Sequence, residues 1–140
     1  MVSMFKNCQK LKELNLLSFD TSNVSNMESM FSKCFNLSNI EISSFNTEKV
    51  ENMKNIFGDC QKLQNINISS FRTNSVINMS EMFKNCHNLL EIDLSNINSS
   101  KVVDMSKMFE GCKSIKEINL SLFDTKNVTN MSFMFMNALI

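Results

Sequence analysis

A 26-residue repeat runs through the chain without insertion or deletion. Its first full copy, MFKNCQKLKELNLLSFDTSNVSNMES, spans residues 4–29, and further copies span residues 30–55, 56–81, 82–107 and 108–133. A fixed period of this length predicts a solenoid, in which each repeat packs mainly against its neighbours. We therefore expect one solenoid domain over residues 1–140. The partial copies at both ends predict that the chain is a fragment of a longer array.

Two hydrophobic periods coexist in each copy. Leu14 and Leu16 alternate with polar residues, which predicts a short strand over residues 13–16 and its equivalents. Val24, Met27 and Met30 fall on one helical face, of the α or the tighter 3₁₀ form. The expected fold is thus an α/β repeat solenoid that resembles a leucine-rich-repeat stack. A parallel sheet of five strands would line its concave face, with short helical turns on the other side.

Polar residues at fixed positions suggest how the expected helical turns begin. Thr21 and its equivalents precede the valine column by three residues, where a hydroxyl can cap a helix. Asn26 and its equivalents are a second candidate cap, or they form a buried amide ladder along the stack. The sequence leaves these two interpretations of the asparagine column open.

A longer string is more specific than the period alone. Cys-x-x-Leu-x-x-Leu-x-Leu-Ser-x-Phe-x-Thr-x-x-Val-x-x-Met-x-x-Met-Phe-x-x-Cys recurs, and residues 16–34 and 120–136 carry it best. It resembles the BspA-type leucine-rich repeat of bacterial surface proteins and lipoproteins, apart from Ile97 and Ser99 at the Phe and Thr positions. The resemblance implies cell-surface or extracellular display, adhesion or binding of host molecules, no enzymatic activity and no cofactor.

The residues that could carry chemistry do not assemble into a recognisable site. The five cysteines recur every 26 residues, which excludes a zinc site of local spacing. Stacked at about 4.8 Å they would lie too far apart for disulfides, so we expect small buried hydrophobes. His87 is the single histidine. No base, orienting carboxylate and nucleophile come together, so we expect no catalytic, cofactor or metal site and no enzyme.

The outward positions of the expected strands are the candidate partner-binding surface. Two of the three outward columns hold five acidic residues and no basic one. They form either a binding face or a solvated surface that keeps the sheet soluble. The candidate residues are Lys12, Glu13, Asn15, Asn39, Glu41, Gln64, Asn65, Asn67, Leu90, Glu91, Asp93, Lys116, Glu117 and Asn119.

The overall charge narrows the class of partner. Fourteen basic and fourteen acidic residues cancel, which argues against nucleic acid and anionic membrane. No apolar stretch reaches the roughly 18 residues of a membrane span. The sequence therefore predicts a non-catalytic surface module that binds a protein or glycan through its concave face. The alternative is a structural spacer whose repeats stack end to end, with self-association.

Overall fold

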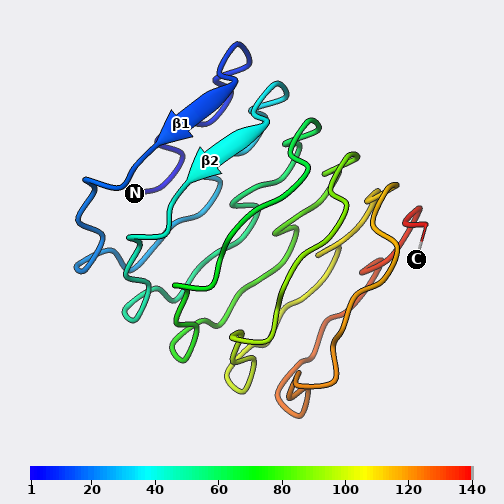
Figure 1. The fold of residues 1–140 in the computed structure, drawn as a ribbon. Helices are drawn as coiled ribbons and strands as arrows, with labels where there is room; N and C mark the ends of the chain where they lie inside the picture. The colour runs from blue at the N-terminus through cyan, green and yellow to red at the C-terminus, as the bar shows by residue number, and fades with distance from the viewer. Residues whose placement is uncertain (140) are drawn as a thin grey trace.

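The computed structural model describes residues 1–139 as a stack of coils, one for each repeat. Figure 1 shows the coils side by side, with the two termini at opposite ends of the stack. We number them coil 1 (residues 4–29), coil 2 (30–55), coil 3 (56–81), coil 4 (82–107) and coil 5 (108–133). The repeat solenoid expected from the 26-residue period is confirmed.

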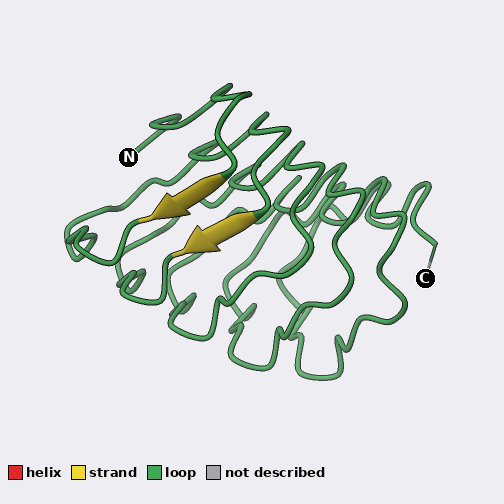
Figure 2. Ribbon diagram, turned by 45° about the horizontal axis from the view of Figure 1, so that its top comes forward, coloured by secondary structure: helices red, strands yellow, loops and turns green. Residues whose placement is uncertain are grey.

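Two strands lie on one side of the stack, which we call the strand face (Figure 2). β1, Glu13–Asn15, pairs in parallel with β2, Asn39–Glu41, and Leu14 lies opposite Ile40. The register equals one repeat, so the same position of each copy meets across the pair. The five-stranded sheet is wrong beyond this pair, because residues 65–67, 91–93 and 117–119 form no strand.

The return side of each coil consists of tight turns, and residues 1–139 contain no helix. The amide of Met30 donates to the carbonyl of Met27 at 3.2 Å, and Ser29 between them has a φ of 55°. A left-handed residue at this position belongs to a β-turn and stops a helix from propagating. The same two positions are left-handed throughout: Ser3, Asn7, Ser29, Lys33, Asn55, Asp59, Glu81, Asn85, Lys107, Gly111, Phe133 and Asn137.

Alternate amides of these turns join neighbouring coils. Met27 and Ser29 of coil 1 donate to carbonyls of coil 2, and Phe31 of coil 2 donates to the carbonyl of Ile56 in coil 3, at 2.9 Å in all three cases. Parallel bridges at the asparagine column, from Asn26 to Asn130, continue this pairing through the stack. The predicted helical turns are therefore wrong. Apolar residues spaced by three and four also fit consecutive turns, and the amides bond to the next coil rather than along the segment.

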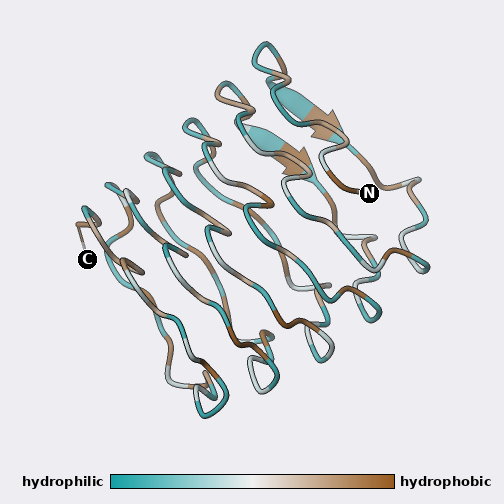
Figure 3. Cartoon of the chain, turned by 180° about the vertical axis from the view of Figure 1, so that it is seen from behind, coloured by the Kyte–Doolittle hydropathy of each residue, from teal (hydrophilic) through white to brown (hydrophobic). Residues whose placement is uncertain are grey.

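The core is a set of side-chain columns that run along the stack. Phenylalanine rings at equivalent positions stack with centroids 5.5–5.8 Å apart, nearly parallel to one another. The Met, Leu and Val columns surround them, and in coils 2–4 they are buried. Figure 3 shows hydrophobic segments recurring at matching places in successive coils. The predicted apolar columns thus form the core of the solenoid, except that Ile66, Ile92 and Ile118 of one column are only partly buried.

The threonine column joins coils rather than capping helices. The hydroxyl of Thr21 donates to the carbonyl of Asn46 at 2.9 Å and accepts from the Asn46 amide at 2.8 Å. Thr47 and Thr73 make the same two bonds to the coil that follows them. The predicted helix cap is wrong, because the structure has no helix start at this position and the hydroxyl bonds between coils.

The asparagine column forms neither a helix cap nor an amide ladder. The side-chain oxygen of Asn26 accepts from the amide of Glu28 at 2.8 Å, two residues further on. Equivalent bonds occur at Asn52, Asn78 and Asp104. An aspartate performs the role as well as an asparagine, because only the oxygen is used. These residues shape the turn through which the chain enters the return side.

Four of the five thiols are packed inside the stack, as expected for small buried residues, and the expectation is wrong for Cys8. Cys34, Cys60, Cys86 and Cys112 are buried and unbridged, and Cys8 is exposed. The Cys34 thiol donates to the carbonyl of Phe5 at 3.1 Å, and the three buried thiols after it repeat this bond in later coils. Burial raises the pKa of Cys34 to about 11 and that of Cys112 to about 12.

The contrast between these thiols predicts a single reactive cysteine. A thiol-specific reagent should modify Cys8 of the native protein quickly, because Cys8 alone of the five is exposed. The others should react at least about 100-fold more slowly, since reaction requires a thiolate that burial suppresses. Timed labelling followed by mass spectrometry measures this. Fast modification of a second thiol in native protein would contradict the buried column.

The left-handed positions predict one stabilising substitution. Lys33 is exposed and has a φ of 62°, a conformation that glycine adopts without the steric cost of a side chain. Lys33→Gly should therefore raise the free energy of unfolding by roughly 0.5 kcal/mol. Lys62, exposed and without a positive φ, is the control, and Lys62→Gly should lower it by about 0.5–1 kcal/mol. Equal losses for both variants in urea denaturation would refute the turn geometry.

Candidate functional site

A groove of about 940 Å³ runs across the strand face from coil 2 to coil 5. Each of these four coils contributes the same three consecutive positions. We call this surface the strand-face groove, and its lining residues are Asn39, Ile40, Glu41, Asn65, Ile66, Asn67, Glu91, Ile92, Asp93, Glu117, Ile118 and Asn119.

The groove brings together most, but not all, of the residues singled out in the sequence. Eight of them line it: Asn39, Glu41, Asn65, Asn67, Glu91, Asp93, Glu117 and Asn119. Glu13 and Asn15 belong to β1 in coil 1, outside the groove. The column that precedes the lining positions also lies outside it, at exposed Lys12, Gln64, Leu90 and Lys116.

The groove is also lined by isoleucines, which strand alternation had assigned to the core. Ile66, Ile92 and Ile118 are partly exposed and lie between the polar lining residues, whereas Ile40 in β2 is buried. Alternation of apolar and polar residues indicates which side chains point inward, but it carries no signal for how tightly neighbouring coils pair. The apolar floor of the groove was therefore missed.

Backbone amides that make no hydrogen bond to the next coil explain why a groove forms on this face. Within residues 1–139 the amides of Glu91, Ile92 and Asp93 make no hydrogen bond, nor do those of residues 65–67. The pairing that joins β1 to β2 does not continue. On the return side of the same coils, by contrast, alternate amides bond to the next coil throughout. The stack is thus closed on one side and open on the other.

The groove is acidic in a chain of zero net charge. Glu41, Glu91, Asp93 and Glu117 line it, and no lysine or arginine does. The ion pairs found in the described chain join other residues: Lys84 with Glu81 and Glu110, and Lys126 with Asp124. The four groove carboxylates therefore have no ion-pair partner among residues 1–139.

Hydrogen bonds lower the pKa of two of these carboxylates. The amide of Ser95 donates to Asp93 at 2.9 Å, and bonds from the backbone and hydroxyl of Ser95 lower the pKa of Asp93. The hydroxyl and backbone of Ser43 lower the pKa of Glu41 in the same way. Asn67 and Asn119, at the same column, accept the equivalent amide bond. This column therefore shapes the chain as well as lining the groove.

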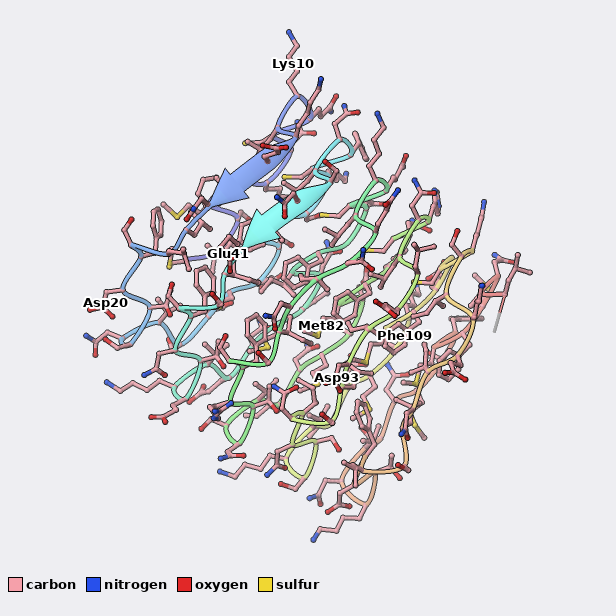
Figure 4. All side chains as sticks on the ribbon, viewed as in Figure 1. Lys10, Asp20, Glu41, Met82, Asp93 and Phe109 are labelled. Carbon is pink, nitrogen blue, oxygen red and sulfur yellow. The ribbon has the colours of Figure 1, made fainter. Side chains whose placement is uncertain are left out.

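Figure 4 places the acidic side chains relative to the edges of the coils. Glu41 and Asp93 lie on the face that carries β1 and β2, whereas Lys10 and Asp20 lie at opposite edges of the stack. Met82 and Phe109, both buried, belong to the core behind that face. The groove is thus a surface between two loop edges, backed by the stacked core.

The groove presents carboxylate, amide and isoleucine side chains. Among residues 1–139, no three His, Cys, Asp or Glu side chains are grouped so that they could hold a metal ion. None of the segments in that range is a helix of the length and hydrophobicity needed to cross a bilayer. Carboxylates, amides and an isoleucine floor can bind cationic, hydrogen-bonding and aliphatic groups of a partner.

Comparison with solved structures finds a leucine-rich repeat protein from Eubacterium ventriosum. The identity is 16% and the TM-score 0.48. The match covers 96% of this chain, which spans 45% of the length of the solved one. No curated protein matches the chain.

The stacked coils agree with the coarser part of the sequence resemblance, a leucine-rich-repeat-like solenoid, and the BspA type remains a prediction. A family model described as "Mycoplasma protein of unknown function, DUF285" matches residues 1–117 and, in a second overlapping match, residues 65–139. These matches extend over nearly all of the described coils. The chain therefore belongs to the DUF285 family.

Proposed function

We propose that the chain is a non-catalytic interaction module that binds a protein or glycan ligand in the strand-face groove. The observation that carries the proposal is the groove itself, which four successive coils build from equivalent positions. A periodic, open surface of this kind presents many contacts to one extended partner.

The contrast between the core positions and the groove positions of each repeat supports this proposal. The phenylalanine stack and the return-side bonds are nearly the same in every coil. The groove positions differ from coil to coil, with Asn, Glu and Asp exchanging at equivalent sites. Variation at these outward positions lets the groove surface change while the stack is kept.

Display on the outside of a bacterial cell is the second part of the proposal, and it rests on the BspA-type sequence resemblance. A protease added to intact cells should then degrade the protein while a cytoplasmic marker stays intact. Protection of the protein until the cells are lysed would overturn this location and leave the binding proposal untouched.

A bulky label placed in the groove tests the proposed binding site. In a Cys8→Ala/Asn65→Cys variant the new thiol lies at an exposed groove position, and alanine already stands at the Cys8 position in Ala138. Binding to an array of extracellular proteins and glycans should be lost when a large maleimide conjugate is attached at residue 65.

The matched control places the same label away from the groove. Glu48 is exposed and does not line the groove, so labelled Cys8→Ala/Glu48→Cys should bind as the unlabelled protein does. Loss of binding with both labels, or with neither, would refute the groove as the binding site.

Apolar side chains at the C-terminal end of the stack favour a second candidate, a spacer that stacks end to end. Phe133, Phe135 and Leu139 are exposed there, and Phe135 stacks on Phe109 from one side. Association would bury this surface and continue the ring column. Light scattering over a concentration series should then show dimers or longer species, and a Phe135→Ser variant should be less associated. A strictly monomeric protein at all concentrations would exclude this candidate.

A further inference from the structure

The strand-face groove combines three features that together specify a partner. It is lined by four carboxylates and no cationic side chain, it has an isoleucine floor, and exposed leucines lie beside it. Leu90 is 47% exposed in the position before Glu91. Leu122 is 66% exposed and lines a smaller hollow with Asp93. Aliphatic and anionic groups therefore alternate over the same few ångströms of surface.

The acidic residues lower the stability of the solenoid when no partner is bound. Glu91 and Glu117 occupy the same position of adjacent coils, so their like charges lie close together. Asparagine occupies this position in Asn39 and Asn65, which shows that the fold accepts a neutral residue there. The carboxylates of Glu91 and Glu117 are thus not needed for the turn or the core, and a bound cation would relieve their repulsion.

We propose that the groove binds a cationic polypeptide segment in which lysine or arginine side chains alternate with aliphatic ones. The inference rests on the proposed function and names the partner's chemistry. The segment crosses the coils along the stack, and its basic side chains meet Glu91, Asp93 and Glu117. Its aliphatic side chains contact Leu90, Leu122 and the isoleucine floor.

The dimensions of the groove suit such a segment. Four coils at a spacing of at least about 4.8 Å span some 15 Å or more, the length of about five extended residues. The smaller hollow, of about 60 Å³, adjoins the groove between coils 4 and 5 and is lined by Asp93, Asn119 and Leu122 among others. It has room for the end of one side chain, with a carboxylate at its wall.

A labelled peptide of about eight alternating lysine and leucine residues is the probe, long enough to cover the groove. Fluorescence anisotropy should show saturable binding that weakens as salt is raised, because exposed charges are screened. The triple variant Glu91→Asn/Asp93→Asn/Glu117→Asn should bind at least about tenfold more weakly. Its midpoint of urea denaturation should be unchanged or raised, since repulsion is removed without a change of shape.

Two controls separate the groove from the net charge. Asp20→Asn/Glu48→Gln/Glu51→Gln removes the same number of charges at exposed positions outside the groove and should keep full affinity. A peptide of alternating glutamate and leucine should not bind. Equal weakening in both triple variants, or equal binding of both peptides, would overturn the inference.

The experiments distinguish failure of the proposed binding site from failure of the proposed cationic partner. If the lysine–leucine peptide fails to bind but the label at residue 65 still blocks a neutral protein or a glycan, the groove is the binding site and the cationic partner is wrong. If the label blocks nothing and the peptide binds to both triple variants alike, both proposals fall.

Discussion

Phe83→Ala should lower the free energy of unfolding by about 3–5 kcal/mol, the cost of removing a fully buried aromatic ring. Phe83 is 0% exposed and its ring lies between those of Phe57 and Phe109, with centroids 5.6 and 5.7 Å away. Alanine would leave a cavity in the middle of the column, and the hydrogen-bonded return side would hold the coils too firmly for the gap to close. Urea denaturation followed by circular dichroism measures the loss.

Phe135 offers a matched control in the same column. It is 41% exposed and has a ring neighbour on one side only, Phe109. Phe135→Ala should therefore cost roughly half as much or less, because little buried surface is lost. A loss below about 1 kcal/mol for Phe83→Ala, or equal losses for the two variants, would contradict the stacked column as the core.

Thr73→Val should cost about 2–4 kcal/mol, although valine has nearly the same shape. Thr73 is 1% exposed, and its hydroxyl donates to the carbonyl of Asn98 at 2.9 Å and accepts from the Asn98 amide at 2.8 Å. Valine removes both bonds and leaves an amide and a carbonyl facing a methyl group. The affected bonds join coil 3 to coil 4, so the loss is one of cohesion between repeats.

The conservative control for this position is Thr73→Ser, because a serine already fills the column at Ser99. Ser99 donates to the carbonyl of Asp124 at 3.1 Å, so the shorter side chain reaches the next coil. Thr73→Ser should cost about 1 kcal/mol, the price of one buried methyl group. If serine and valine destabilise equally in urea, the hydroxyl does not join the coils.

The repeat architecture could be predicted from the sequence because every copy carries the same apolar positions. Phe31, Cys34 and Leu37 recur at equal intervals, and a stack is the arrangement that buries all of them at once. The burial of the cysteines followed from the same reasoning. Position within the repeat was therefore sufficient to identify the core at these three positions.

The return side could not be predicted, because its hydrophobic spacing fits both helices and consecutive turns. The deciding residues are the left-handed ones, such as Ser29 and Lys33, and these have no common identity. Glycine would have revealed such positions, yet of the twelve only Gly111 is a glycine. The bond of the Thr21 hydroxyl to the next coil could not be predicted either, because its direction depends on the same turn geometry.

The polar lining of the candidate groove could be predicted from the sequence, and its apolar floor could not. The polar positions, among them Glu91 and Asp93, were identified because strand alternation turns them outward. The isoleucine floor was not, because its exposure depends on coils that do not pair on this face. Pairing between coils is a property of the whole stack, and no local pattern reports it.

The central claim is that neighbouring coils are joined by backbone hydrogen bonds on the return side, whereas the groove positions of the strand face are not. Hydrogen exchange tests this claim most directly. Within coil 4 the amides of Phe83 and Asn85 donate to coil 5 at 2.9 and 2.7 Å, whereas those of Glu91 and Asp93 make no hydrogen bond in the described chain. Exchange at Phe83 and Asn85 should be slower by at least about 100-fold than at Glu91 and Asp93. Equal protection of the two sets would show that the sheet is closed and that the open groove does not exist.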